Sequence, residues 1–277
     1  MGLFSVLELS IVLSTHQAKF EAVAFKGDFE ANIAKIAGWG YKGVELAIRD
    51  PDLINADELE AILASHALKV PAIGTGQAWG EERLSFTNPA PEVRNATVHR
   101  IKRHIQLAKR LNSLVIIGLI RGVTPPGQTK IQSMHYLQEC LQECCQAAVI
   151  EGVRLALEPL NRYETDLIRT VDEGLELIQL IGAPNLGLLL DTFHMNIEEP
   201  GIEESICRSG ENTYHFHVAD SNRWYPGGGH LDFKAILLAL QSTGYRGWIS
   251  GEFMPMPDPD TAAQRSFAFF RQIFKGN

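Results

Sequence analysis

The most restrictive feature of the chain is an alternation of short apolar runs with longer amphipathic segments, which continues from one end to the other. Each apolar run has the length and composition of a strand that is buried on both faces. Eight such strands are predicted: FSVLELS (4–10), GVELAI (43–48), KVPAIG (69–74), LVIIGLI (114–120), RLALEPL (154–160), LGLLLDTF (186–193), TYHFHVAD (213–220) and GWISGEF (247–253). The spacing indicates one strand–helix unit repeated along the chain.

Helical periodicity fills the intervals between these strands. The predicted helices span 29–40, 56–68, 90–112, 132–152, 170–182, 202–210, 232–244 and 260–274. Several begin at Asp, Thr or Asn and end at Gly, which are ordinary helix-capping signals. Buried strands that alternate with helices predict a parallel sheet covered on both faces. Eight units in 277 residues predict an α/β fold, a (β/α)₈ TIM barrel that forms a single domain over residues 1–277.

An open, doubly wound sheet is the alternative architecture for alternating strands and helices. Such a sheet commonly carries a glycine-rich phosphate turn after its first strand. The segment LSIVLSTHQAKF (9–20) contains no GxGxxG pattern, and no Walker lysine motif occurs in the sequence. The sequence therefore favours the closed barrel.

The overall composition argues against several classes of protein. A net charge of −8 is unsuited to binding nucleic acid through its phosphates, so no nucleic-acid partner is expected. No apolar stretch approaches the roughly 20 residues needed to cross a membrane. Three of the four cysteines, Cys140, Cys144 and Cys145, fall in one predicted helix, which favours reduced thiols in a cytoplasmic protein. The apolar segment ILLAL (236–240) is compatible with a homo-oligomer but does not require one.

The predicted strand in LGLLLDTFHMN (186–196) starts as a leucine run and stops at Asp191, with His194 three residues later. In (β/α)₈ barrels the catalytic groups lie at the carboxyl ends of the strands. The strands on either side also carry side chains that bind metals or protons, namely Glu158, His217 and Glu252. Each lies about one strand–helix unit from the next. We therefore expect these side chains to meet at one end of the barrel.

Each of these side chains, taken singly, has an ordinary structural explanation. A glutamate at a strand end is commonly solvated or ion-paired, and a histidine inside a strand is commonly a hydrogen-bonded core residue. Three carboxylates at one barrel mouth, however, would repel one another strongly unless a cation lay among them. Oxygen-rich ligation with one imidazole suits Mn²⁺ or Mg²⁺, and Co²⁺ or Zn²⁺ are also compatible. The pattern predicts one bound divalent metal ion.

Four segments carry a resemblance to a known family: LEPLNRYET (157–165), LLLDTFHMNIEE (188–199), HFHVADSNR (215–223) and GEF (251–253). They resemble the xylose-isomerase-like TIM-barrel superfamily of sugar isomerases and epimerases, and are most similar to its ketose 3-epimerase branch, the tagatose and psicose epimerases. The resemblance implies a small-molecule sugar or sugar phosphate as substrate and one metal, with Mn²⁺ expected first. It assigns the metal to Glu158, Asp191, His217 and Glu252, and substrate binding to His194 and Arg223.

The implied chemistry is proton transfer next to a ketose carbonyl. Chelation of the sugar by the metal would polarise the carbonyl and stabilise an ene-diolate. Epimerisation needs a base on one face of the carbon and an acid on the other, and Glu158 and Glu252 are the expected acid–base pair. If the carbonyl re-formed at a different carbon, the same site would catalyse aldose–ketose isomerisation.

Further residues are candidates for contacts with the sugar. Glu45 lies in the short motif GVEL on the second predicted strand and is expected to bind a sugar hydroxyl, with an exposed or ion-paired glutamate as the alternative. Trp79 and Trp224 fall in predicted loops at the catalytic end, and one of them, with Trp224 as our choice, is expected to stack on the sugar. Arg83 and Arg121 are candidates for binding a phosphate if the substrate carries one.

Several other functions remain open at this stage. Inosose isomerase or dehydratase and hydroxypyruvate isomerase use similar metal ligands within the same superfamily. An AP-endonuclease-like phosphodiesterase shares the barrel but would need further histidines after the third and fourth strands. The corresponding segments, VPAIGTGQAWG (70–80) and LVIIGLIRG (114–122), contain none. A sugar-binding barrel without catalytic activity is the least favoured alternative, because both glutamates are present.

Overall fold

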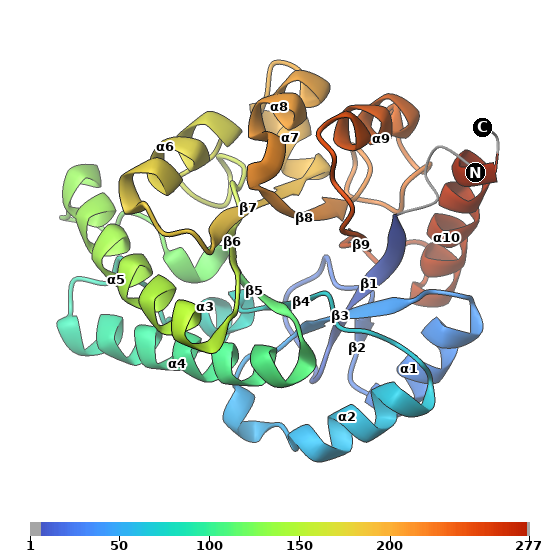
Figure 1. The fold of residues 1–277 in the computed structure, drawn as a ribbon, viewed down its shortest axis with the longest axis horizontal. Coiled ribbons are helices and arrows are strands. Elements are labelled where there is room, and N and C mark those ends of the chain that lie inside the picture. The colour runs from blue at the N-terminus through green and yellow to red at the C-terminus, as the bar shows by residue number, and fades with distance from the viewer. Residues whose placement is uncertain (1–6, 276–277) are drawn as a thin grey trace.

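The computed structural model describes residues 7–275, which form a closed parallel barrel surrounded by helices (Figure 1). The barrel strands are β1 (Glu8–Ser14), β3 (Gly43–Ala47), β4 (Ala72–Gly74), β5 (Leu114–Ile117), β6 (Leu155–Leu157), β7 (Leu186–Asp191), β8 (Thr213–Val218) and β9 (Trp248–Gly251). Each strand pairs with the next in this order, and β9 pairs with β1 to close the ring. A short strand, β2 (Phe25–Lys26), pairs with the end of β1. The predicted (β/α)₈ barrel is confirmed.

Helices cover the outside of the barrel (Figure 1). They are α1 (Phe29–Gly38), α2 (Ala56–Ser65), α3 (Gly76–Glu82), α4 (Pro91–Leu111), α5 (Lys130–Glu151), α6 (Val171–Ile181), α7 (Thr192–Glu198), α8 (Ile202–Ser209), α9 (Phe233–Ser242) and α10 (Pro259–Lys275), with 3₁₀ turns η1 (Pro51–Leu53), η2 (Leu119–Arg121) and η3 (Gly210–Asn212). Thr129 and Thr170 cap α5 and α6 by accepting backbone N–H groups. Gly152 and Gly182 end these helices with φ of 69° and 66°, which glycine adopts without strain. No described helix is long and apolar enough to span a membrane.

The first strand differs from its predicted position. We expected it at 4–10, of which residues 4–6 lie outside the described part of the chain, whereas β1 covers Glu8–Ser14. The pairing with β3 explains the difference, because its register runs from Ser10 opposite Gly43 to Ser14 opposite Ala47. The short helices α3 and α7 were not predicted. They follow directly on β4 and β7, at the carboxyl ends of the strands.

The interior of the barrel is apolar on one side and polar on the other. The apolar side is a cluster from β4 to β7, formed by Ala72, Leu114, Ile116, Ala156 and Leu189. The polar side comes from β1, β3, β8 and β9, and contains Ser10, Glu45, His215, His217 and Ser250, all buried. A larger apolar core packs between the strands and the helices. The main core therefore lies outside the barrel, which leaves its interior free to hold polar groups.

Candidate active site

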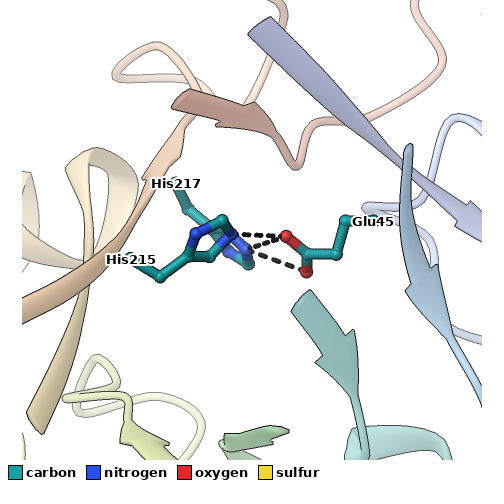
Figure 2. Close-up of side chains that lie close together, drawn as sticks. All are labelled: Glu45, His215 and His217. Carbon is teal, nitrogen blue, oxygen red and sulfur yellow. Dashed lines mark hydrogen bonds and ion pairs between the residues drawn. The ribbon is translucent and has the colours of Figure 1, made fainter. Parts of the chain in front are cut away.

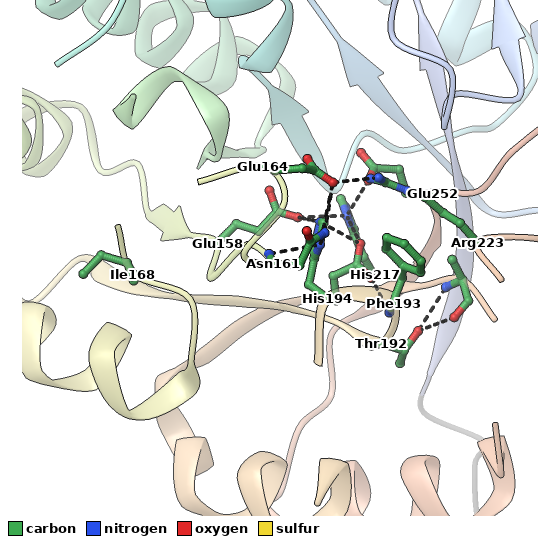
Figure 3. A network of polar contacts seen from close by, with 12 residues as sticks. Glu158, Asn161, Glu164, Ile168, Thr192, Phe193, His194, His217, Arg223 and Glu252 are labelled. Atoms are coloured by element: carbon green, nitrogen blue, oxygen red, sulfur yellow. Dashed lines mark hydrogen bonds and ion pairs between the residues drawn. The ribbon is translucent and has the colours of Figure 1, made fainter. Parts of the chain in front are cut away.

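The carboxyl ends of four consecutive strands bring the predicted metal ligands together, and Figure 3 shows three of them, Glu158, His217 and Glu252. Glu158 follows β6, Asp191 ends β7, His217 lies near the end of β8, and Glu252 follows β9. One ligand atom from each of the four lies within 4.8 Å of those from the other three. The sequence spacing thus predicted a real spatial cluster. The role of its members as metal ligands is taken up below as a proposal.

The atoms that face one another in this cluster have no hydrogen-bond partners among the described residues. They are Glu158 Oε1, Asp191 Oδ2 and His217 Nδ1. His217 Nδ1 lies 3.9 Å from Glu158 Oε1, 3.8 Å from Asp191 Oδ2 and 3.9 Å from Glu252 Oε2. These separations are too long for hydrogen bonds, and buried polar atoms without partners are rare. Three carboxylates and one imidazole around a common centre fit a hard divalent cation such as Mn²⁺ or Mg²⁺.

Without a metal, the cluster holds protons because its acids are buried close together. Burial, and then the charge of Glu252, raise the pKa of Glu158 well above its ordinary value. Burial raises the pKa of Asp191, and it raises the pKa of Glu252 to about 7 although His217 and Arg223 act against it. Burial alone would lower the pKa of His217, but the carboxylate of Glu45 raises it to about 10. A divalent cation would replace these protons as the compensating positive charge.

His194 lies beside the cluster as a neutral hydrogen-bond donor. It sits in α7, and Asp191 caps this helix by accepting a 2.7 Å hydrogen bond from the Phe193 N–H. Asn161 Nδ2 lies 2.7 Å from His194 Nδ1, and because the amide nitrogen can only donate, Nδ1 must accept. The remaining nitrogen, Nε2, then carries the proton and lies 3.9 Å from both Glu158 Oε1 and Asp191 Oδ2. Burial lowers the pKa of His194, so the ring stays uncharged.

Arg223 reaches the cluster from the loop after β8. Its Nη1 donates to Glu164 Oε1 at 2.8 Å, and its Nη2 lies 3.4 Å from Glu252 Oε2. The guanidinium packs over the ring of Phe193, 4.7 Å from its centre. Glu164 was not predicted as a site residue. Its place in LEPLNRYET, six residues after Glu158, was the only available signal, because its contact with Arg223 spans most of two strand–helix units.

A cavity of about 280 Å³ opens next to these residues. This volume is at the small end of the roughly 300–1,000 Å³ that ligand pockets occupy. Glu158, Glu164, His194, His217, Arg223 and Glu252 line its polar side. The lining also includes apolar residues such as Val12, Phe20, Ala47, Trp79 and Ile116. The cavity therefore suits a small polar molecule with one less polar face.

Comparison with known proteins identifies the family. The sequence model of the xylose isomerase-like TIM barrel family matches residues 33–273 of the chain. The chain belongs to the xylose isomerase-like TIM barrel family. The resemblance that was inferred from four sequence motifs is therefore confirmed.

Relatives within the xylose isomerase-like family include several ketose 3-epimerases. The chain is 29% identical over 261 residues to L-ribulose 3-epimerase of Methylomonas sp. (strain DH-1), covering 91% of this chain and 90% of that protein. It is 32% identical over 234 residues to D-psicose 3-epimerase of Ruminiclostridium cellulolyticum, covering 80% of this chain and 77% of that protein. The crystal structure of D-allulose 3-epimerase from Methylomonas sp. in complex with D-allulose superposes with a TM-score of 0.83 at 25% identity, and covers 97% of each chain.

Some residues that were predicted to contact substrate lie elsewhere in this member of the xylose isomerase-like family. Trp224 is not among the described residues that line the cavity, whereas Trp79 is. A tight turn explains this, because the Arg223 N–H donates to the Asp220 carbonyl and Arg223 has φ of 60°, which directs the arginine inward. Trp79, and not Trp224, therefore borders the cavity.

The two arginines proposed for phosphate binding also have other partners. Arg121 is fully buried, and its guanidinium donates to the carbonyl oxygens of Glu158, Leu167 and Ile168. Arg121 links η2 to the segment after β6 through these hydrogen bonds and is unavailable to a substrate. The prediction that Arg121 binds a phosphate is therefore wrong. The exposed Arg83 packs over the ring of Trp79, 5.8 Å from its centre.

Glu45 lies at the floor of the cavity, but its carboxylate is engaged inside the barrel (Figure 2). Its Oε2 accepts from His215 Nε2 at 2.7 Å and from His217 Nε2 at 2.9 Å. Its Oε1 lies 3.0 Å from His217 Nε2. The expected contact of Glu45 with a sugar hydroxyl would compete with these bonds.

Proposed function

We propose that the protein is a ketose 3-epimerase that depends on one divalent metal ion, with Mn²⁺ expected. The observation that carries the proposal is the convergence of buried ligand atoms without hydrogen-bond partners, beside a small cavity at the carboxyl end of the barrel. The names of the relatives that match most of the chain support it. A phosphodiesterase of the AP-endonuclease type is disfavoured, because the residues after β4 and β5 are Thr75 and Gly118 instead of metal-binding histidines.

The proposed chemistry is removal of a proton from C3 of the sugar and its return on the opposite face. Glu158 and Glu252 enter the cluster from β6 and β9, on opposite sides of His217 (Figure 3), and are the proposed acid–base pair. Burial raises the pKa of Glu252 to about 7 in the metal-free protein, and the charge of a bound cation would lower it. The cation held by the four ligands would polarise the ketone and stabilise the negative charge that develops when the proton leaves.

His194 and Arg223 are the proposed donors to the substrate oxygens. The Nε2–H of His194 faces the cluster and has no partner among residues 7–275, so it is available to an oxygen of the sugar. The guanidinium of Arg223 is held in place by Glu164, and its buried Nε likewise lacks a partner in the described part of the chain. Both donors are thus oriented before the substrate binds, which lowers the cost of ordering them.

We also propose that the substrate is a free ketose without a phosphate. Phosphate sites in proteins usually gather several backbone N–H groups or arginines. The described residues that line the cavity include one arginine, Arg223, and one lysine, Lys19. Arg223 already pairs with Glu164. The apolar part of the lining, with Trp79, is better suited to the carbon face of an unphosphorylated sugar.

Solvent exchange at C3 tests the proposal directly. Metal-stripped protein is reloaded with Mn²⁺, Co²⁺, Mg²⁺ or Zn²⁺ and incubated in deuterated water with D-allulose, L-ribulose or their phosphates. We expect deuterium at C3 and formation of the C3 epimer, followed by NMR, with the free ketoses. Glu158→Gln and Glu252→Gln should abolish exchange, whereas Glu143→Gln, in an exposed ion pair with Lys102, should not. Absence of exchange with every metal and sugar would contradict the proposal.

A further inference from the structure

The contact between Glu45 and two histidines crosses the interior of the barrel. Glu45 extends from β3, and His215 and His217 extend from β8, so that the side chains point toward one another (Figure 2). Each of these three residues is only 1% exposed. The distances of 2.7 Å from His215 Nε2 and 2.9 Å from His217 Nε2 to Glu45 Oε2 are those of charge-assisted hydrogen bonds.

His217 therefore has different surroundings at its two ring nitrogens. Its Nε2 donates to Glu45, whereas its Nδ1 faces Glu158, Asp191 and Glu252 and has no hydrogen-bond partner among the described residues. A carboxylate at Nε2 keeps a proton on that nitrogen, because a carboxylate can only accept. The lone pair for a metal must then come from Nδ1, the nitrogen on the side of the cluster.

We propose that Glu45, anchored by His215, is a positioning residue that holds the ring of His217 with Nδ1 directed at the metal site. This inference rests on the metal site of the proposed function. Glu45 does not touch the metal or the substrate in this role, which replaces the sugar contact expected from the sequence. Carboxylates that bind the far nitrogen of a metal-bound histidine fix its ring orientation, and their loss commonly weakens metal affinity.

His215 supplies the second fixed point that Glu45 needs. It lies two residues before His217 on the same strand, so both rings face the interior, with centroids 5.2 Å apart and an angle of 77° between their planes. Other hydroxyl groups in this part of the interior do not replace it. Ser10 and Ser250 are buried near these residues, but their hydroxyls have no partner within the described chain. Without His215, the Glu45 carboxylate would keep its contacts with His217 but lose its second fixed point.

The three residues are also the right types to hold a metal themselves, and their spacing argues against this. Two ligand atoms on one tetrahedral Zn²⁺ lie about 3.4 Å apart when each bond is about 2.1 Å long. The observed separations of 2.7 and 2.9 Å are those of direct hydrogen bonds. The carboxylate is therefore bonded to the histidines and not to an intervening ion.

Calorimetric titration with Mn²⁺ tests the role of Glu45 without depending on activity. Glu45→Gln should weaken Mn²⁺ binding by about 10- to 100-fold. His215→Leu removes the hydrogen bond that anchors Glu45. It should weaken Mn²⁺ binding about 3- to 10-fold, which is less than the effect of Glu45→Gln. His215→Gln keeps an N–H donor and should restore affinity close to that of the unchanged protein. Ser10→Ala is the matched control, because it changes a buried interior side chain that makes no hydrogen bond to this group.

A second readout separates positioning from a general effect on folding. In Zn²⁺-loaded protein labelled with ¹⁵N-histidine, the His217 Nε2 proton should be visible and protected from solvent, and Glu45→Gln should remove that protection. If Glu45→Gln does not fold, the comparison of His215→Gln with His215→Leu decides alone. Equal Mn²⁺ affinities for these two variants, or a second Mn²⁺ bound per chain, would overturn the inference while leaving the epimerase proposal intact. No Mn²⁺ binding by the unchanged protein would refute the metal site and both proposals.

Discussion

Binding of Mn²⁺ to the metal-free protein should release protons, and more of them at pH 6 than at pH 8. A ligand must lose its proton before it can bind a metal. With a pKa of about 10, His217 carries the extra proton at both pH values, so its Nδ1 must release it. With a pKa of about 7, Glu252 is about 10% protonated at pH 8 and about 90% protonated at pH 6. From His217 and Glu252 together we expect about one proton per ion at pH 8 and about two at pH 6.

The same linkage sets the pH dependence of the affinity. Each proton that is released changes the dissociation constant about tenfold per pH unit, or about 1.4 kcal/mol. Between pH 8 and pH 6 the affinity for Mn²⁺ should therefore fall by roughly 10²- to 10⁴-fold. Calorimetry in buffers with different ionisation enthalpies gives the number of protons directly. Glu252→Gln should lose the additional proton at pH 6. Affinity that does not change with pH, with no proton release, would refute this reasoning.

Three substitutions test other parts of the structure. Glu252→Gln should stabilise the metal-free protein at pH 8 by ~1–3 kcal/mol in urea unfolding. The folded-state pKa of Glu252, about 7, exceeds the ordinary value of 4.5. The stability that protonated Glu252 contributes is therefore present below pH 4.5 and is lost as the pH rises through 7. Gly118→Ala should lower activity at least about tenfold with an unchanged circular dichroism spectrum, because the new Cβ would lie 2.6 Å from Glu158 Oε2 and displace that carboxylate. Arg121→Met should lower the free energy of unfolding by ~3–5 kcal/mol, because three buried carbonyls lose their donor.

Each of these expectations has a clear contrary result. A lower stability of Glu252→Gln at pH 8 would show that the pair with Arg223 outweighs the cost of burying the charge. Full activity of Gly118→Ala would show that Glu158 can move without loss of function. A change below 1 kcal/mol for Arg121→Met would mean that water replaces the lost donor.

The sequence predicted the barrel and the four clustered side chains because both depend on local patterns. Each strand–helix unit repeats the same direction, so residues at successive strand ends must meet at one end of the barrel. Glu158, Asp191, His217 and Glu252 follow from this rule without any knowledge of packing. The limits of the first strand did not follow, because they depend on its register with β3 and β9.

The partners of the cluster could not be predicted, because they depend on contacts between distant segments. Glu45 and His215 are 170 residues apart in the sequence, and β3 comes near β8 because β1 pairs with β9 and closes the barrel. The pairing of Glu164 with Arg223 likewise depends on the shape of two loops. The burial of Arg121 could not be predicted either, because its sequence segment could equally have formed an exposed loop.

The central claim is that one divalent cation is held by four side chains at the carboxyl end of the barrel. Anomalous X-ray diffraction at the manganese edge, from crystals grown with Mn²⁺, tests it most directly. The account predicts one strong peak per chain, bonded to Glu158, Asp191 and Glu252 and to Nδ1 of His217. A peak at another position, or no peak while these side chains keep their present arrangement, would contradict it.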